Sequence, residues 1–205
     1  MAPVSKKAKN LSPPFVPPGE ISSLGDSWSL ALQPFGCRFD DPRHACRMPA
    51  RRRPSLLALL FWIGVSYAAA LPGALFMPDG WYRRIEKPWW TPPDALFGPV
   101  WTVLFTLMGV AMYLVSRRDQ HPDAPKAHGL FFLQLTLNMA WSPLFFGLHR
   151  PDLALVDIVL LWLTLVAMIR TFHGIRPAAG LSQIPYLLWI SFAGALNAAI
   201  WWLNR

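Results

Sequence analysis

The chain has 205 residues and a formal net charge of +8; 54% of its residues are hydrophobic, 14% are aromatic and only 15% are charged. The charges lie between long uncharged runs, which is typical of a membrane protein. The positive balance does not indicate a nucleic-acid partner, because no basic run is interleaved with aromatic residues and the basic residues gather beside apolar segments. We therefore expect the lipid bilayer, and no nucleic acid, as a partner.

Residues 1–50 hold eight prolines and no apolar periodicity, so we expect a disordered, proline-rich leader. Met48 stands just before Arg51–Arg53 and a hydrophobic run, which is how a membrane protein ordinarily begins. Two interpretations of the leader stay open: it is a gene-start artefact, or it is an organelle-targeting extension. The leader also contains the two cysteines, Cys37 and Cys46, which lack a CxxC spacing, so we expect neither a disulfide framework nor a metal site.

Five apolar runs follow the leader. The first, Ser55–Met77, has 23 residues, which at about 1.5 Å per residue is enough to cross a hydrocarbon core of about 30 Å. The connections between the runs are short, so neighbouring helices should be antiparallel. We expect an all-α fold, an integral membrane bundle of five transmembrane helices in one domain at 51–205. The helices are predicted at about 55–77, 95–115, 129–148, 153–169 and 181–203.

The stretch Trp81–Trp101, WYRRIEKPWWTPPDALFGPVW, joins the first two runs and is rich in tryptophan. It is too polar to form a helix in lipid. Its prolines remove backbone donors and fix φ, so we expect a rigid, turning loop followed by a helix start. We interpret this aromatic loop as a lid over a ligand site. The prolines are Pro88, Pro92, Pro93 and Pro99.

Lysines and arginines are unevenly divided between alternate loops. With the leader left aside, one set of loops carries eight and the other carries five. The positive-inside rule then predicts a multi-pass protein with a cytoplasmic N-terminus and the aromatic loop on the outer side. Which membrane holds the chain is left open. The first set comprises Arg51–Arg53, Arg117, Arg118, Lys126, Arg170 and Arg176, and the second Arg83, Arg84, Lys87, Arg150 and Arg205.

Two of the predicted helices carry a polar and aromatic stripe. In the third, Gln134, Asn138, Trp141 and Phe145 recur at three- and four-residue spacing and share one face. Lipid offers amides no partner, so this face should point inward, either to bridge neighbouring helices or to line a cavity. Prolines in these two helices, at 143 and 185, predict bends. The stripe of the fifth helix consists of Tyr186, Trp189, Ala193, Asn197 and Trp201.

The second predicted helix adds Trp101 and Phe105, followed by two methionines at the same spacing, a pattern that usually means packed core. Trp101 ends the aromatic loop, however, and three aromatic faces beneath that loop predict an apolar pocket with a few polar groups. Asp157 is the one charge inside an apolar run. We expect it near a helix end, reaching water or a loop, with a relay or a ligand contact as the alternative.

The chain contains no GxGxxG, GxxxxGK[ST], GxSxG or HExxH motif, so no conventional nucleotide or nucleophile site is predicted. Its histidines beyond the leader are scattered at the ends of the predicted helices. Contact with water or lipid headgroups is one interpretation of them, and axial ligation of a haem by one of them is the other. They are His121, His128, His149 and His173.

Three blocks stand out: WYRRIEKPWWTPPDALFGPVWTVLF at 81–105, LNMAWSPLFFG at 137–147 and IPYLLWISFAGALNAAIWWLN at 184–204. Together and in this order they resemble the tryptophan-rich sensory protein family, TspO/MBR, whose animal members are the translocator proteins once called peripheral benzodiazepine receptors. The resemblance covers about residues 55–205. It implies a five-helix homodimer that binds porphyrins such as protoporphyrin IX and haem, as a sensor or scavenger that regulates porphyrin metabolism and the stress response.

The resemblance also implies which residues act. Some bacterial members are thought to degrade porphyrin in light and oxygen, with Trp101 and Trp189 matching the oxidised indoles; enzymic activity is therefore left open. The porphyrin or haem is expected as a ligand, and no cofactor is required. Combined with the stripes, the expected ligand-binding residues are Trp81, Tyr82, Trp101, Phe105, Asn138, Trp141, Phe145, Trp189, Ala193 and Asn197.

The sequence departs from the family at the sterol-recognition stretch of its animal members. Asn197 is followed by Ala198 and Ala199 instead of the expected aromatic residues, so we expect a tetrapyrrole in preference to a sterol. Two other functions are open. One is a transporter of porphyrins or other amphipathic molecules, for which five helices without an internal repeat give no support. The other is an interaction or assembly protein whose aromatics only anchor it at the membrane interface.

Overall fold

The computed structural model describes residues 55–76 and 80–205. Every regular element within these residues is helical, which confirms the predicted all-α fold class. The predicted leader, residues 1–50, and Arg51–Arg53 lie outside the described residues, so the leader stays a prediction.

Four helical segments in the described part of the chain are long and apolar enough to cross a membrane. With the shorter apolar helix α2 (Leu56–Ala68), they form the predicted five-helix bundle. The long helices in these four segments are α5 (Phe97–Ser116), α6 (Ala124–Ser142), α7 (Pro151–Ile175) and α9 (Ile184–Leu203).

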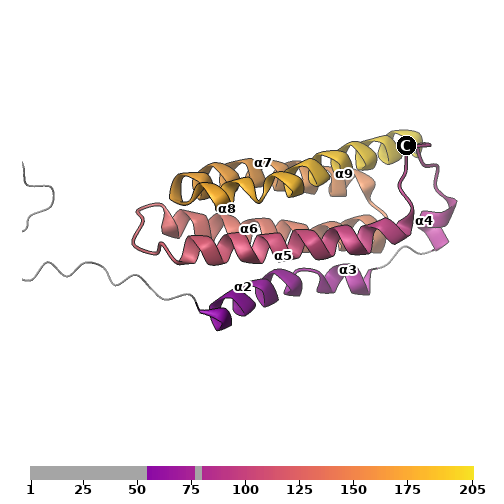
Figure 1. Ribbon diagram of the computed structural model, residues 1–205. Coiled ribbons are helices and arrows are strands. Elements are labelled where there is room, and N and C mark those ends of the chain that lie inside the picture. The colour runs from indigo at the N-terminus through magenta and orange to yellow at the C-terminus, as the bar shows by residue number, and fades with distance from the viewer. Residues whose placement is uncertain (1–54, 77–79) are drawn as a thin grey trace, which may run out of the picture. The chain divides into compact units, whose positions relative to one another are not determined.

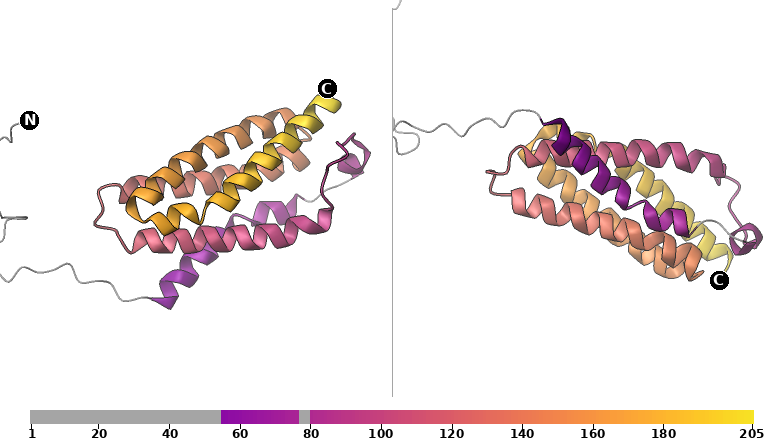
Figure 2. Two further views of the ribbon diagram at one scale, coloured as in Figure 1. Left: turned by 45° about the horizontal axis from the view of Figure 1, so that its top comes forward. Right: turned by 90° about the horizontal axis from the view of Figure 1, so that it is seen from below.

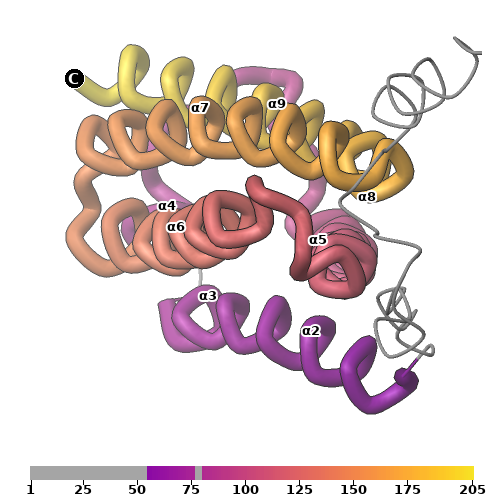
Figure 3. Tube along the Cα trace, turned by 90° about the vertical axis from the view of Figure 1, so that its left-hand side faces the viewer, coloured from indigo at the N-terminus to yellow at the C-terminus, as the bar shows by residue number. Residues whose placement is uncertain are grey.

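The helices are stacked in three layers (Figures 1 and 3). Helices α5 and α6 form the middle layer, and α7 and α9 cover one side of it. On the other side, α2 packs against α5, and the short helix α3 (Leu71–Leu75) packs against α6. The short helix α8 (Pro177–Leu181) leads into α9 and contacts both α7 and α5. This arrangement leaves one end of the bundle to be closed by the segment around α4 (Gly80–Arg84).

The first predicted helix, 55–77, is not continuous, and this part of the prediction is wrong. Helix α2 ends at Ala68, and Ala69 and Ala70 form a tight turn before α3 begins. The cause is Pro72, which has no N–H to donate and whose ring would clash with the carbonyl of Ala68 in an unbroken helix. Helix α2 alone has 13 residues. It is therefore about 20 Å long, shorter than a hydrocarbon core of about 30 Å.

Other helix ends also differ from the prediction for local reasons. Helix α6 begins at Ala124 instead of 129, because Pro125 lies in the first turn, where its missing N–H has no helical partner to lose. Helix α7 continues to Ile175 instead of ending at 169. The charge of Arg170 does not end it, because a long arginine side chain can carry its guanidinium along the helix toward the membrane surface.

The outer surface of the bundle is largely apolar, and several polar side chains are buried in its interior. Leu57, Val103 and Leu188 are among the many large apolar side chains that are exposed, while Gln134 and Asn197 are buried. A soluble monomer rarely exposes apolar surface on this scale. The distribution is that of an integral membrane protein, in which lipid covers the outside.

Gly109 lies where α2 comes very close to α5. A Cβ atom at this position would lie 2.5 Å from the Cα of Ile63. We expect Gly109→Ala to push the two helices apart and to lower the free energy of unfolding by about 1–3 kcal/mol. The measurement is thermal unfolding in detergent, followed by circular dichroism.

Gly64→Ala is the matched control, because Gly64 lies on α2 and no neighbouring atom is within 4 Å of the place that a Cβ would take. This variant should unfold at or slightly above the temperature of the unmodified chain, since alanine favours a helix by about 1 kcal/mol over glycine. Equal unfolding temperatures for the two variants would contradict the close packing of α2 on α5.

Candidate ligand-binding cavity

A cavity of about 600 Å³ lies inside the bundle at the end that carries α4. Helices α5, α6, α7 and α9 supply most of its wall, and α3 with the turn before it supplies another part. Most lining side chains are aromatic or aliphatic. A volume between about 300 and 1,000 Å³ with an apolar wall and few polar groups is typical of sites for small organic ligands.

All of the predicted ligand-binding residues except Trp81 line this cavity. The structure thus brings together the aromatic loop and the stripes predicted on the second, third and fifth helices. The roles of these residues in binding stay a prediction. They are Tyr82, Trp101, Phe105, Asn138, Trp141, Phe145, Trp189, Ala193 and Asn197.

Two tryptophans of the wall are stacked on phenylalanines from their own helical segments. The rings of Trp101 and Phe105 have centroids 5.1 Å apart and planes 28° apart. The rings of Trp141 and Phe145 are 5.0 Å and 20° apart. Residues four apart lie on the same face of a helix, so each stack fixes the orientation of its indole ring. The cavity therefore has rigid, flat aromatic surfaces on α5 and α6.

Asn138 both bridges two helices and lines the cavity. Its Nδ2 donates to the hydroxyl of Tyr186 over 2.8 Å, and that hydroxyl donates to Oε1 of Gln134 over 3.2 Å. Gln134 is fully buried and lies outside the cavity; besides the bridge between α6 and α9, its Nε2 donates to the sulfur of Met108 on α5 over 3.7 Å. Among the described residues no donor reaches Oδ1 of Asn138, which leaves a hydrogen-bond acceptor in the cavity wall.

A second polar bridge lies nearer to α4. Trp141 Nε1 donates to Oδ1 of Asn197 over 3.1 Å, and Nδ2 of Asn197 donates to the carbonyl of Pro151 over 2.7 Å. Three helices, α6, α9 and α7, are thereby joined at one point. Because its indole N–H is satisfied, Trp141 can present an apolar ring to the cavity without an unpaired donor.

Trp81 does not line the cavity but supports its wall from outside. Its ring stacks on His149 with centroids 4.6 Å apart, and it contacts the edge of Phe145 at 5.8 Å. His149 has a positive φ of 54°, which is uncommon for a residue other than glycine. This left-handed residue turns the chain between the π-helical segment η2 (Pro143–Gly147) and α7. Trp81 thus holds Phe145, a wall residue, in place.

The loop after α4 is tied to the far end of α9. The N–H of Glu86 donates to Oδ1 of Asn204, and Nδ2 of Asn204 donates to the carbonyl of Glu86, both over 2.9 Å. Thr91 closes the next turn by donating its hydroxyl to the carbonyl of Pro88 over 2.7 Å. Trp89 is 96% exposed, so it is free to contact lipid headgroups. The loop therefore has the turning, anchored form that its prolines predict.

Tyr82 is the buried residue of α4 that faces the cavity. Its burial raises the pKa of its phenol above the ordinary value of 10.0, and the negative charge of Asp94 raises this pKa further. The amino group of Lys87 lies 4.0 Å from the centre of the Tyr82 ring. Tyr82 is therefore a neutral wall residue at ordinary pH, with a cation on its ring face.

The two prolines predicted to bend the third and fifth helices act differently. Pro143 begins a π-helical turn, in which the N–H of Leu148 donates to the carbonyl of Pro143 over 2.8 Å. This turn carries two wall residues, Phe145 and Phe146. Pro185 lies in the first turn of α9, where its missing N–H has no helical partner to lose. The predicted fifth helix is interrupted just before it, since α8 ends at Leu181 and α9 begins at Ile184.

Asp157 does not reach water, so that expectation is wrong. The residue is only 6% exposed, and its Oδ2 is buried without a hydrogen-bond partner in the described part of the chain. The reason is that α7 packs between α6 and α9 from its first turns, which covers Asp157 although it lies near the helix end. The neighbouring Ile158 lines the cavity, whereas Asp157 does not.

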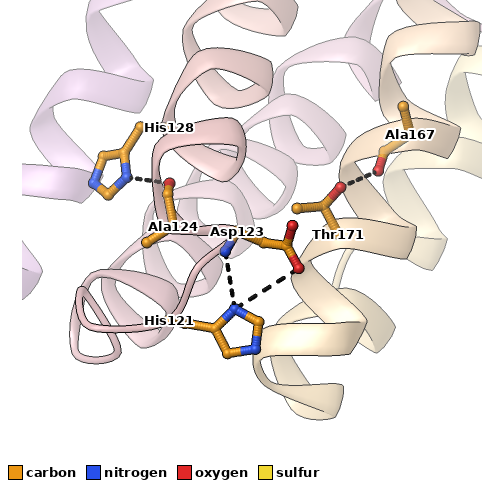
Figure 4. Close-up of polar contacts among 6 residues, drawn as sticks. All are labelled: His121, Asp123, Ala124, His128, Ala167 and Thr171. Atoms are coloured by element: carbon orange, nitrogen blue, oxygen red, sulfur yellow. Dashed lines mark hydrogen bonds and ion pairs between the residues drawn. The ribbon is translucent and has the colours of Figure 1, made fainter.

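None of the histidines in the described part of the chain lines the cavity. His121 and His128 lie around the connection between α5 and α6, at the opposite end of the bundle, and bond locally to Asp123 and Ala124 (Figure 4). Axial ligation of a haem inside the cavity by one of these side chains therefore has no support. The remaining two are His149 and His173.

Two parts of the cavity wall were not predicted. One is the turn around Ala69, Ala70 and Gly73, which lines the cavity because α2 stops short of it. Pro72 within an otherwise apolar run was the signal that could have located this turn. The other is the face of α7 formed by Ile158 and Leu161, whose aliphatic side chains look like any core residue in a sequence.

Tyr186 is fully buried and does not line the cavity, so its bridge can be tested without changing the cavity wall. We expect Tyr186→Phe to destabilise the bundle by about 1–2 kcal/mol, since it leaves the amides of Asn138 and Gln134 without their shared partner. Tyr113→Phe is the control, because the hydroxyl of Tyr113 only accepts an exposed hydrogen bond from the N–H of Ser55. The measurement is the unfolding temperature in detergent. An equal fall for both variants would contradict a stabilising role of the bridge.

The sequence profile described as the TspO/MBR family matches residues 56–203 of the chain. The chain is 41% identical over 153 residues to the "Tryptophan-rich protein TspO" of Chlorobaculum tepidum, covering 73% of this chain and 97% of that protein. It is 37% identical over 150 residues to "Protein CrtK" of Rhodobacter capsulatus, covering 72% of this chain and 92% of that protein.

An animal protein is also similar. The "Translocator protein" of Bos taurus is 37% identical over 127 residues, which cover 61% of this chain and 75% of that protein. The family profile spans the described helices from α2 to α9, including every helix that lines the cavity. The chain therefore belongs to the TspO/MBR family of membrane proteins.

Proposed function

We propose that the chain binds a flat tetrapyrrole, such as protoporphyrin IX or haem, in the cavity beneath α4 and acts as a membrane sensor or scavenger of that ligand. The observation that carries this proposal is the apolar cavity of about 600 Å³ inside the bundle, with stacked indole and phenyl rings on its walls. Flat aromatic ligands pack well against such rings. The ligand is the partner in this proposal, and no further cofactor is required.

The distribution of polar groups suits a tetrapyrrole better than a purely apolar molecule. The free Oδ1 of Asn138 is an acceptor in the cavity wall that can meet the pyrrole N–H groups of a metal-free porphyrin. At the end of the cavity near α4, Asp94 lines the wall and Lys87 rests on the ring of Tyr82. Carboxylate side arms of a porphyrin would point to this end, because a carboxylate buried in the apolar part would lack a partner.

The packing of the other half of the bundle favours binding over transport. Met112 and Val115 of α5, Ala127 of α6 and Phe172 of α7 are all fully buried there. They fill the space below the cavity with close-packed side chains. A transporter would need a second arrangement that opens this half, and the described contacts contain no sign of one.

The proposal extends to light-dependent degradation of the bound porphyrin, with Trp101 and Trp189 as the oxidised residues. Both indoles line the cavity. A porphyrin excited by light can pass its energy to dioxygen, and the reactive oxygen formed can oxidise an indole or the porphyrin within the same enclosure. Homodimer formation and a cytoplasmic N-terminus are also part of the proposal and rest on the family resemblance and on the distribution of basic residues.

Filling the cavity tests the binding proposal directly. We expect Ala193→Trp to weaken binding of protoporphyrin IX at least tenfold, because Ala193 lines the cavity and an indole would occupy the space of the ligand. Binding is measured by titration, from the change in porphyrin absorbance. Ala195→Trp, on the exposed side of the same helix, is the control and should bind normally. Equal binding by both variants would place the ligand elsewhere.

The photochemical part has its own test. The double variant Trp101→Phe, Trp189→Phe should lose bound protoporphyrin IX under light several-fold more slowly than the unmodified chain, because phenylalanine is much harder to oxidise than tryptophan. Trp162→Phe, Trp202→Phe is the matched control, since both of these tryptophans are exposed outside the cavity. Samples kept in the dark correct for simple dissociation. Equal rates of pigment loss for the two double variants would contradict the proposed roles of Trp101 and Trp189 in porphyrin degradation and would leave the binding proposal unchanged.

A further inference from the structure

Trp189 forms part of two separate hollows. It lines the interior cavity, and it also lines a groove of about 580 Å³ on the outer face of the bundle between α5 and α9. The groove is apolar, and Val103 and Leu188 within it are 57% and 65% exposed. Both helices are membrane-spanning segments, so the groove faces lipid. The Trp189 side chain is thus the partition between the hydrocarbon of the bilayer and the cavity.

The Trp189 side chain is held by packing, without a hydrogen bond. The indole N–H groups of Trp141 and Trp162 each donate a hydrogen bond, to Asn197 and Ser191, whereas no hydrogen bond of the described residues involves the Trp189 side chain. Among the described residues, the Trp189 ring contacts two other rings, Phe97 at 5.7 Å and Phe192 at 5.6 Å. Because it has no hydrogen bond, this indole can change rotamer at the cost of its ring contacts and its packing against the hydrophobic core.

The backbones on either side also leave room. Near the start of α9 the two helices are joined by Gln183, whose Nε2 donates to the carbonyl of Leu107 over 3.1 Å. Further along, α9 diverges from α5 (Figure 2, left view). Gly98 lines the cavity on the α5 side of this opening, is exposed, and has no atom within 4 Å of the place where a Cβ would be. Side-chain packing is therefore sparse beside Gly98, on the α5 side of the seam between these two helices.

We propose that the cavity is loaded from the hydrocarbon region of the bilayer, through the opening between α5 and α9, with Trp189 as the gate. This inference rests on the proposed function and narrows it: the ligand is a flat, membrane-partitioned tetrapyrrole, taken from lipid and not from water. The loop after α4, where an alternative path would run, is tied to α9 by the paired hydrogen bonds between Glu86 and Asn204.

Narrowing the outer groove without touching the cavity tests this path. In the double variant Val103→Phe, Leu188→Phe both changes lie in the groove and outside the cavity. The matched control is Val156→Phe, Leu163→Phe on the lipid-facing side of α7, where exposure is similar at 59% and 55%. Full-length protein in lipid nanodiscs is mixed with vesicles containing protoporphyrin IX, and porphyrin fluorescence gives the rates of uptake and release. A separate titration gives Kd.

We expect the groove variant to take up and release protoporphyrin IX about tenfold more slowly, with Kd changed less than twofold, because a narrowed path raises one barrier for both directions. The control variant should keep the rates of the unmodified chain. Unchanged rates in the groove variant, with normal Kd, would overturn the path and leave the proposed function standing. Equal slowing in both double variants would also overturn it. An absence of saturable binding by the unmodified chain would overturn the proposed function and the path together.

Discussion

Lipid offers no hydrogen-bond partner to a polar side chain, and the arrangement of this bundle depends on that constraint. The amides of α6 and α9 must find partners inside. Asn138 and Gln134 share the hydroxyl of Tyr186, and Asn197 bonds to the indole of Trp141 and the carbonyl of Pro151. These two bridges fix the distance between α6 and α9 at the level where the cavity lies. The two helices therefore cannot move together and close the space between the aromatic side chains beside the bridges. The cavity therefore depends on the positions of the bridging amides as well as on the size of the aromatic rings.

The two halves of the bundle differ because their side chains differ. The half near α8 is filled by methionine, valine and phenylalanine side chains that are fully buried. The half near α4 has large rings that stack against their own helices and leave a space between them. The break at Pro72 adds to this asymmetry, since it ends α2 early and lets the following turn and α3 form a wall. The loop after α4 then covers the open end and is held there by Asn204.

Much of the site could be predicted from the sequence, because a polar or aromatic stripe at helical spacing must face inward in lipid. Asn138, Trp141 and Phe145 lie on the cavity wall for that reason, as do Trp189 and Asn197. The profile and relatives of the TspO/MBR family confirm the resemblance carried by the three tryptophan-rich blocks.

Other features depend on packing that no spacing pattern contains. Ile158 is an ordinary aliphatic residue, and only the assembled bundle shows that it faces a space. Trp81 supports Phe145 instead of lining the cavity because of the left-handed turn at His149, which nothing in the sequence indicates. Asp157 is covered because its neighbours on α6 and α9 pack against α7 almost to the helix end, which distance along the chain does not reveal.

The central claim is that a flat tetrapyrrole occupies the cavity beneath α4. The most direct measurement is an experimental structure of the full chain in lipid with protoporphyrin IX bound. The predicted result is porphyrin density between the rings of Trp101, Trp141 and Trp189, with the carboxylate arms toward Tyr82 and Lys87. Porphyrin density on the lipid-facing surface, with the cavity filled by collapsed side chains, would contradict the claim.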